Sequence, residues 1–484
     1  MFYRLCKDTF IRNIQGYGYI SSQLTRHDRV YDQAGAYFLM AIDRTPRHFE
    51  EILERASAFF IDAPIGELNI DLLAFLDDLE ENQYIVAGED EKQLSYREPR
   101  FSYAMANPKT AVHNFRQSTD KQSYTDTADF FYGLFRNSPH IFSAQIELTN
   151  RCNEKCLHCY IPHEQKVETL ETPLIEKVLH QLAEMGTLGL TLSGGEVFLH
   201  PDVEKILQLA CQLDFSISIL SNLTPMKSRH ISLLKEINPS LVQTSLYSMD
   251  ADEHDRITQL KGSHTKTLKA LELLIENDIP VQISCPVMRT NLHAYRSVLE
   301  WAQRHRCKAQ TDFIMMARTD FSTENLVERI TLEEQELLLK DILEVDIDYG
   351  GLLEETHKLK TIEERANEPV CGVAVDNLCL SASGTFYPCS GWQGLPVGDA
   401  RTQNVRDIWE NSPQLNELRQ ITKGSFPRCL SCTEQEFCAM CLVRNFNESN
   451  GDMFKINPHF CESAALNRKL VKEHYAKIGR SDYF

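Results

Sequence analysis

Short apolar runs alternate with amphipathic stretches through the middle of this chain of 484 residues. The apolar runs predict buried strands and fall at 142–149, 188–193, 215–221, 240–247, 280–287 and 308–315. The stretches between them space their apolar residues as helices do, at about 172–185, 202–213, 227–237, 264–277 and 292–305. Six strands that alternate with helices predict an α/β fold with a parallel sheet and right-handed crossovers.

The first 95 residues follow a different pattern. Short strand-like segments over 10–35 precede three amphipathic stretches, which predicts a winged helix-turn-helix domain at 1–95. Such domains often bind DNA, but the segment 71–82, predicted as the third helix, is acidic, and the chain has a formal net charge of −19. DNA phosphates would repel this surface, so we expect no nucleic-acid partner.

Two further segments connect the predicted domains. Residues 96–140 are polar and rich in proline, and we expect a linker with one short helix near 126–136. Residues 331–368 are charged and predict a helical bridge between the α/β domain at 141–330 and a C-terminal domain at 369–484. No apolar run approaches the roughly 20 residues that span a membrane. Residues 1–25 lack the apolar core of a signal peptide, so we expect a cytoplasmic protein with reduced thiols.

Eleven of the fifteen cysteines form two sets with close spacing. The first set is Cys152, Cys156 and Cys159, and the second is Cys371, Cys379, Cys389, Cys429, Cys432, Cys438, Cys441 and Cys461. Thiolates are the usual ligands of iron–sulfur clusters, and the Cys-x2-Cys pairs of the second set would also suit zinc. Taken alone, the second set is equally consistent with a zinc site and with an iron–sulfur cluster. Cys211, Cys285 and Cys307 lie in apolar surroundings and are expected to be core thiols.

The first set resembles the cysteine motif of the radical S-adenosylmethionine (SAM) superfamily. Its Cys-x3-Cys-x2-Cys run follows the strand predicted at 142–149, and Gly194, Gly195 and Glu196 follow the next strand, as that family's glycine-rich motif does. The resemblance implies a partial six-stranded (β/α)6 barrel similar to a TIM barrel. It also implies a 4Fe-4S cluster whose open iron binds SAM and releases a 5'-deoxyadenosyl radical.

The same resemblance suggests which residues contact SAM. Glu196 would accept a hydrogen bond from the SAM ammonium group, and the backbone of His158 would meet adenine, while its side chain is expected at the surface. Other contacts would come from the carboxyl ends of the barrel strands, where ordinary loop residues are an equal alternative. These candidates are Ser221, Asn222, Ser245, Tyr247, Ser284, Asn291 and Arg318. No general acid or base is assigned.

The second set resembles the SPASM extension of that superfamily. Gly384 to Cys389 matches its Gly-x4-Cys element, and Cys429, Cys432 and Cys438 match its middle run. The resemblance implies two auxiliary 4Fe-4S clusters, which makes three clusters in all. The ligands would be Cys371, Cys379, Cys389 and Cys441 for one cluster, and Cys429, Cys432, Cys438 and Cys461 for the other. Without Cys379 the first auxiliary cluster would have an open iron.

The N-terminal domain resembles the peptide-recognition domain beside maturases of ribosomally made peptides, similar to the small chaperone of pyrroloquinoline quinone synthesis. Such a domain adds a leader peptide as an extra strand on a sheet edge. We therefore expect a maturase that forms a thioether or carbon–carbon crosslink in a precursor peptide, with flavodoxin or ferredoxin as the electron donor. The alternatives are a peptide epimerase, a formylglycine-forming maturase of the anaerobic sulfatase type, and a non-enzymatic iron–sulfur redox protein.

Overall fold

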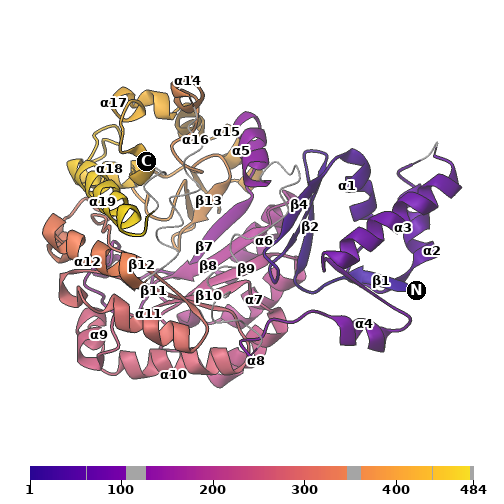
Figure 1. The fold of residues 1–484 in the computed structure, drawn as a ribbon, viewed down its shortest axis with the longest axis horizontal. Helices are drawn as coiled ribbons and strands as arrows, with labels where there is room; N and C mark the ends of the chain where they lie inside the picture. Colours follow the sequence, from indigo (N-terminus) through magenta and orange to yellow (C-terminus); the bar gives the residue numbers. More distant parts are fainter. Residues whose placement is uncertain (61–62, 105–126, 346–360, 439, 480–484) are drawn as a thin grey trace.

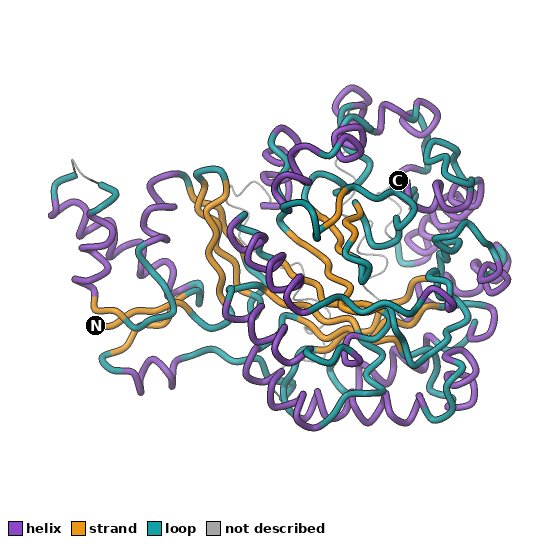
Figure 2. Tube along the Cα trace, turned by 180° about the vertical axis from the view of Figure 1, so that it is seen from behind, coloured by secondary structure: helices purple, strands orange, loops and turns teal. Residues whose placement is uncertain are grey.

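The fold consists of an N-terminal body packed against one side of a larger α/β body (Figure 1). A computed structural model describes residues 1–60, 63–104, 127–345, 361–438 and 440–479. Figure 2 shows the strands of the larger body as one continuous sheet seen from behind. In the described part of the chain, no helix has the length and apolar character that crossing a membrane requires.

The centre of the larger body is a run of parallel strands in the order β12-β11-β10-β9-β8-β7. Their bounds are β7 Ser143–Thr149, β8 Gly189–Gly194, β9 Ser216–Leu220, β10 Leu241–Ser245, β11 Val281–Pro286 and β12 Lys308–Asp312. The connecting helices are α6 Thr172–Glu184, α7 Val203–Gln212, α8 Ser228–Ile237, α10 Ser263–Glu276 and α11 Tyr295–Arg304. All of these elements confirm the pattern expected from the sequence. Helix α9 (Ala251–Thr258) was not predicted.

Alternation along each strand separates an apolar outer face from a polar inner face. On β7, Ile146 and Leu148 are fully buried in the large hydrophobic core that the helices cover. Gln145 points to the other face, where its Nε2 donates to Ser193 Oγ of β8 at 2.8 Å. In register across the sheet, Ser245 of β10 lies beside Ser284 of β11. The inner face of the sheet is therefore lined with polar side chains toward the carboxyl ends of the strands.

The cysteine-rich segment extends the same sheet, which the sequence did not predict. Strand β13 (Asn377–Leu380) pairs with β7 in parallel, and β14 (Thr385–Tyr387) and β15 (Gly398–Asp399) continue antiparallel. This pairing brings Cys379 of β13 opposite Gln145 of β7. The C-terminal cysteines are thus attached directly to the edge of the barrel.

Helices surround the cysteine-rich segment and complete the larger body (Figure 1). They are α12 Leu332–Val345, α14 Ile362–Ala366, α15 Val405–Asn411, α16 Pro413–Arg419, α17 Pro427–Leu430, α18 Leu442–Glu448 and α19 Pro458–Lys477. Helices α12 and α14 lie in the predicted bridge, of which residues 346–360 are outside the described part. Arg329, which follows the last barrel strand β12 in the chain, forms an ion pair with Glu448 of α18 through two hydrogen bonds of 2.5 and 3.0 Å. This ion pair connects the end of the barrel to the cysteine-rich segment.

The N-terminal body contains two small sheets and four helices. One sheet joins β1 Phe2–Leu5, β5 Arg47–His48 and β6 Ile85–Gly88, and the other joins β2 Thr9–Ile14, β3 Tyr17–Ser22 and β4 Asp28–Tyr31. The helices are α1 Gln33–Met40, α2 Phe49–Ser57, α3 Ile65–Glu81 and α4 Glu91–Arg97. The expected strands and the three amphipathic helices are present, and they enclose a core of their own.

Aromatic contacts join the two bodies. Tyr19 of β3 packs edge-to-face on Phe131 of α5 (Thr127–Asn137) and on Phe142 beside β7, with ring centroids 5.1 and 5.5 Å apart. Arg12 of β2 forms an ion pair with Asp214, between α7 and β9, at 2.9 Å. Helix α5 is the short helix expected in the linker. The N-terminal body is therefore packed directly against the barrel.

One expectation about the core is wrong. Cys285 and Cys307 are buried as expected, but Cys211 of α7 is exposed. The neighbouring buried positions on α7 are Leu207 and Ala210, and Cys211 follows them on the outer side of the helix. Apolar neighbours in the sequence did not distinguish the two sides of this helix.

Candidate functional site

The first three cysteines lie on the cysteine loop, residues 150–160, directly after β7. All three are half-buried. The loop is held by backbone bonds to the end of α9, since the amides of Lys155 and Leu157 donate to the carbonyls of Thr258 and Ile257 at 2.9 and 3.0 Å. Helix α9 therefore lies directly against the cysteine loop and holds it through these two bonds.

The thiols of the cysteine loop are close enough to influence one another. Burial raises the pKa of Cys156 well above its usual value, and Glu154, Cys159 and Cys152 raise this pKa further. Burial also raises the pKa of Cys152 to about 11. Because a thiolate is the ligand form, a metal or a cation must stabilise this charge for the set to bind as thiolates.

Gly194 and Gly195 are required by the close approach of the cysteine loop. A Cβ atom on Gly194 would lie 2.1 Å from the carbonyl oxygen of Thr149, and one on Gly195 would lie 2.3 Å from that of Asn150. Gly194 also has a φ of +150°. Here the group that approaches the glycines is the protein's own backbone at the start of the cysteine loop. The two amides that follow Gly194 donate to that backbone at 2.7 and 2.9 Å.

Glu196 joins the ends of β8 and β9. Its side chain is fully buried and accepts from Ser221 Oγ at 2.7 Å and from the amide of Asn222 at 2.7 Å. Burial raises the pKa of Glu196 to about 7. Asn222 in turn donates from Nδ2 to Cys152 Sγ at 3.8 Å. The structure thus brings together Glu196, Ser221, Asn222 and the first cysteine, which the sequence placed at one edge of the sheet.

His158 is not the surface side chain that we expected. It is half-buried, its ring packs edge-to-face on Tyr247 with centroids 5.2 Å apart, and its Nδ1 is buried without a hydrogen-bond partner. Burial lowers the pKa of His158 to about 4. Tyr247 also donates from its hydroxyl to Cys156 Sγ at 3.7 Å. His158 and Tyr247 therefore pack together beside the thiol of Cys156.

The remaining predicted residues are two serines on the inner face of the sheet, one asparagine that bonds the backbone, and one arginine near the cysteine loop. Ser245 and Ser284 lie side by side on the polar inner face. Asn291 is structural, because its Nδ2 donates to the carbonyl of Tyr247 at 2.7 Å. Arg318 forms an ion pair with Glu324 at 2.7 Å, and its Nε is buried without a partner. The amide of Thr319 donates to the carbonyl of Tyr160 at 2.9 Å, so Arg318 lies close to the cysteine loop.

The C-terminal cysteines fall into two groups in space. Burial raises the pKa of Cys371 to about 11, and the nearby thiols of Cys441 and Cys389 raise it further. Cys379 is buried, and its pKa is raised first by burial and then by Glu147 and Cys389. In the second group, Cys438 has a pKa raised by burial and by its neighbours Cys461, Cys429 and Cys432. The cysteines that influence one another in this way are divided as in the two predicted sets, and their role as cluster ligands stays a prediction.

Thiols dominate all three groups, a donor set that fits iron–sulfur clusters. Within the residues that the structure describes, no three or more His, Cys, Asp or Glu side chains are grouped so as to hold one metal ion.

The structure also shows two charged side chains near the cysteines that the sequence did not single out. Glu147 of β7 is buried, accepts from Gln393 Nε2 at 3.2 and 3.3 Å, and has a pKa raised to about 7 by burial. Lys166 donates to Cys159 Sγ at 3.1 Å.

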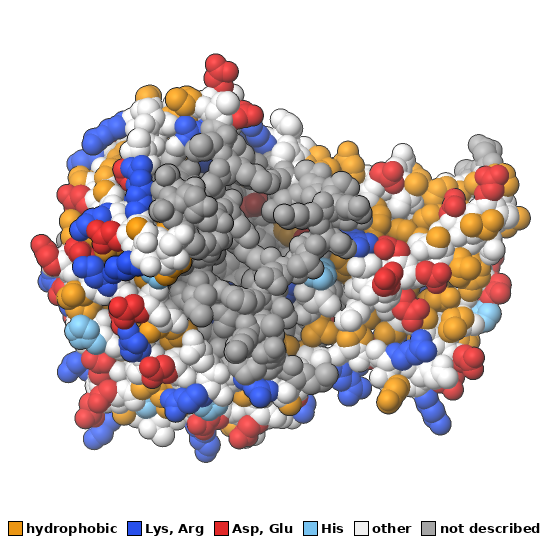
Figure 3. All heavy atoms as spheres, viewed as in Figure 1, with side chains coloured by type: hydrophobic (Ala, Val, Ile, Leu, Met, Phe, Trp, Pro, Cys, Tyr) orange, Lys and Arg blue, Asp and Glu red, His pale blue; other side chains and the backbone are white. Residues whose placement is uncertain are grey.

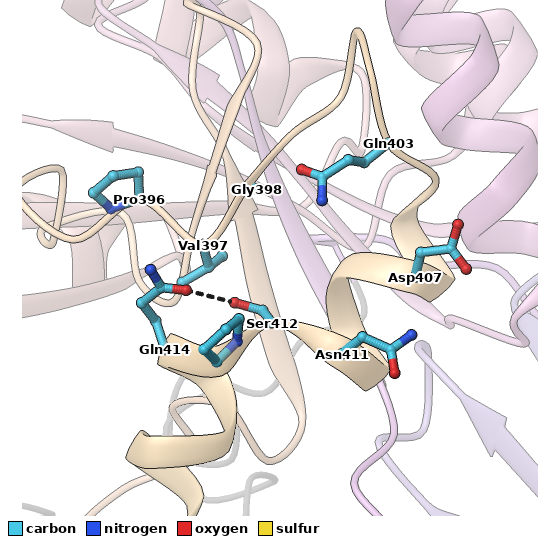
Figure 4. Close-up of a pocket in the computed structure, with 9 residues that line it drawn as sticks. Pro396, Val397, Gly398, Gln403, Asp407, Asn411, Ser412 and Gln414 are labelled. Atoms are coloured by element: carbon cyan, nitrogen blue, oxygen red, sulfur yellow. Dashed lines mark hydrogen bonds between the residues drawn. The ribbon is translucent and has the colours of Figure 1, made fainter.

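A separate pocket of about 360 Å³ lies between β15 and helices α15 and α16. Figure 4 shows that Asp407, Asn411 and Gln403 line one part of it, and that Ser412 donates to Gln414. None of the predicted site residues lines this pocket. It is therefore distinct from the cysteine groups.

Comparison with known families fits this geometry. Residues 146–302 match the Radical SAM superfamily, and residues 371–433 match SPASM, an iron-sulfur cluster-binding domain. The chain carries a radical SAM domain and a SPASM domain. The first match contains all three cysteines of the cysteine loop and the glycines packed against it, and the second contains five of the eight C-terminal cysteines.

Individual relatives extend the likeness. The chain is 27% identical over 321 residues to the antilisterial bacteriocin subtilosin biosynthesis protein AlbA of Bacillus subtilis, covering 64% of this chain and 69% of AlbA. It is 25% identical to an AdoMet-dependent heme synthase of Methanosarcina barkeri, covering 67% of this chain and 96% of that relative. Streptococcus suis SuiB bound to its precursor peptide SuiA shares the fold, with a TM-score of 0.62 at 15% identity over 92% of this chain and 97% of SuiB.

Proposed function

We propose that this chain is a radical SAM peptide maturase that modifies a ribosomally made precursor peptide. The observation that carries the proposal is the cysteine loop packed against Gly194 and Gly195, in a chain that also has a SPASM domain. AlbA acts in the biosynthesis of a bacteriocin, and SuiB was crystallised with a precursor peptide. The fold shared with SuiB covers 92% of this chain. The N-terminal body is larger than the part that the match omits, so at least some of it is included in the shared fold.

Cys152, Cys156 and Cys159 would hold the cluster that binds SAM. SAM bound there would take one electron from the reduced cluster and give methionine and a 5'-deoxyadenosyl radical, which would abstract hydrogen from an unactivated carbon. The chain's own residues shape the site around it. Glu196 fixes the β8 and β9 ends through Ser221 and Asn222. The buried Nδ1 of His158 is available to bind SAM or substrate.

Other SAM contacts would come from Ser245, Ser284 and Arg318. The two serines lie on the polar inner face, where a ligand would meet them beyond the carboxyl ends of the strands. Arg318 lies beside the cysteine loop, and its buried Nε is unpaired. That donor suits a carboxylate or ribose oxygen.

The C-terminal thiols would hold two auxiliary clusters. Cys371, Cys379, Cys389 and Cys441 would form one ligand set, and Cys429, Cys432, Cys438 and Cys461 the other. The mutual influence of the thiols within each group supports this division. Such clusters can accept the electron that is released when a substrate radical closes a bond. A low-potential carrier such as flavodoxin or ferredoxin would supply the first electron.

The N-terminal body would be a winged helix-turn-helix domain that binds the leader of the precursor. Each of its two small sheets ends in strands that pair on one side only, and an extended peptide could add a strand there. Hydrophobic side chains gather on the surface of this body (Figure 3). On helix α3 of the same body, Ile65, Ile70 and Leu73 are exposed. An exposed apolar surface of this kind favours peptide binding over nucleic-acid binding.

The reaction that we propose is an intramolecular thioether or carbon–carbon crosslink. The test is to incubate the anaerobic enzyme with SAM, dithionite and a precursor peptide encoded beside it, and to measure the peptide mass. Each crosslink should remove two hydrogens. An unchanged mass with deuterium incorporated at an α-carbon would mean epimerisation. Formylglycine formed from serine also removes two hydrogens, so a product that reacts with an aldehyde reagent, or that has lost a cysteine sulfur, would mean formylglycine formation. 5'-Deoxyadenosine without any peptide change would favour a non-peptide substrate, as the likeness to heme synthase suggests.

A further inference from the structure

A lysine outside the cysteine motif lies against the first cysteine set. Lys166 Nζ donates to Cys159 Sγ at 3.1 Å. Its charge also acts electrostatically on Cys152. The side chain is half-buried, so water screens these interactions only in part. Lys166 therefore places a positive charge in direct contact with the thiol of Cys159.

The backbone holds Lys166 in this position. Gln165 and Val167 on either side of it accept hydrogen bonds from Asn150 Nδ2 and Arg151 Nε, both at 3.0 Å. The amide of Glu168 donates to Asn150 Oδ1 at 2.7 Å. The segment 165–168 is thus bonded to the first residues of the cysteine loop. A lysine in a free surface loop would not be constrained in this way.

With a cluster bound, the site would hold negative charge that a neighbouring cation offsets. As cluster ligands the three cysteines would be thiolates, and the buried side chain of Glu154 lies 3.4 Å from Cys156 Sγ. Lys166 also acts on Glu154 electrostatically. Reduction of a cluster adds one more negative charge, so a neighbouring cation favours the reduced state. Net charge and hydrogen bonds to the sulfurs are among the factors that set cluster potentials.

We propose that Lys166 is a positioning residue that raises the reduction potential of the cluster held by Cys152, Cys156 and Cys159. The proposal rests on the proposed function, since it requires a cluster at this site. It deepens that function by naming the residue that makes the first electron transfer more favourable. Lys166 acts through Cys159 rather than on SAM or on the substrate.

The test is a redox titration of the reconstituted enzyme without SAM, followed by electron paramagnetic resonance. The signal of interest is the one that is absent from the Cys152/Cys156/Cys159→Ala variant. In Lys166→Met the ratio of reduced to oxidised cluster at a fixed potential should fall tenfold or more, which is a shift of about 59 mV or more for one electron. Lys166→Gln keeps an N–H donor but loses the charge, and it should shift in the same direction. Lys166→Arg should stay close to the parent.

Lys155→Met is the matched control, because Lys155 is an exposed lysine of the cysteine loop. Its shift should be smaller than that of Lys166→Met. An unchanged potential in Lys166→Met, with iron retained, would overturn the inference but leave the proposed function intact. An unchanged potential combined with weaker SAM binding would overturn it in favour of a contact with the SAM carboxylate. A parent protein without a cluster at this site would overturn the proposed function and the inference together.

Discussion

Replacing Gly195 by alanine should damage the SAM cluster site while leaving the rest of the fold in place. The new Cβ would lie 2.3 Å from the carbonyl oxygen of Asn150 and 2.4 Å from that of Arg151. The amides of Gly195 and Glu196 donate to the same stretch of backbone at 2.7 and 2.9 Å. The methyl group would therefore push the cysteine loop away and weaken both bonds, at a cost of about 2–6 kcal/mol from overpacking and lost hydrogen bonds.

Iron content and SAM binding measure this effect. Gly195→Ala should lose about four irons per chain, the content of one 4Fe-4S cluster, and should no longer bind SAM. Retention of the other irons and of the parent circular dichroism spectrum would show that the damage is local. Gly66→Ala is the matched control, because a Cβ there meets nothing within 4 Å and lies in helix α3. Full iron content and normal SAM affinity in Gly195→Ala would refute the role given to the glycine pair.

Two further predictions concern stability. Glu448→Gln should destabilise the protein by about 3 kcal/mol in urea unfolding, because it leaves the mostly buried Arg329 without a carboxylate partner. The exposed pair of Glu410 with Arg406 is the control, and Glu410→Gln should cost at most about 0.5 kcal/mol; equal costs for the two variants would contradict the reasoning. Burial and the neighbouring His264 lower the pKa of His254 to about 4 from 6.5, so the unfolded chain binds more protons between these values. The contribution of His254 to stability should therefore fall by about 2 kcal/mol from pH 7 to pH 5, measured as the change with pH in the stability difference between the parent and His254→Asn.

The sequence predicted the barrel well because its strands and helices have strong and different periodicities. All six parallel strands lie where the apolar runs placed them, since each strand is buried on at least one face. Strand β13 was missed because it has only four residues and is recognisable only by its pairing with β7. Helix α9 was missed because its exposed face is charged and only His254, Ile257 and Thr258 are buried.

Motif spacing predicts which cysteines would bind each cluster, but it could not predict their surroundings. His158 is half-buried because Tyr247, on another strand end, packs against it. Lys166 lies in a polar loop without a motif, and only its tertiary contacts connect it to Cys159. Glu147 occupies an alternating position in a strand that gives no sign of the approach of Gln393. Such contacts arise from segments that are distant in the sequence.

The central claim is that the chain holds three iron–sulfur clusters, of which one binds SAM on the cysteine loop. The most direct test is to measure iron, sulfide and 5'-deoxyadenosine in anaerobically purified protein and in the Cys152/Cys156/Cys159→Ala variant. We predict about twelve irons in the parent and about eight in the variant, with 5'-deoxyadenosine formed from SAM and dithionite by the parent alone. About four irons together with zinc would contradict the assignment of the C-terminal cysteines. A fully loaded parent that forms no 5'-deoxyadenosine would contradict the claim of radical SAM chemistry.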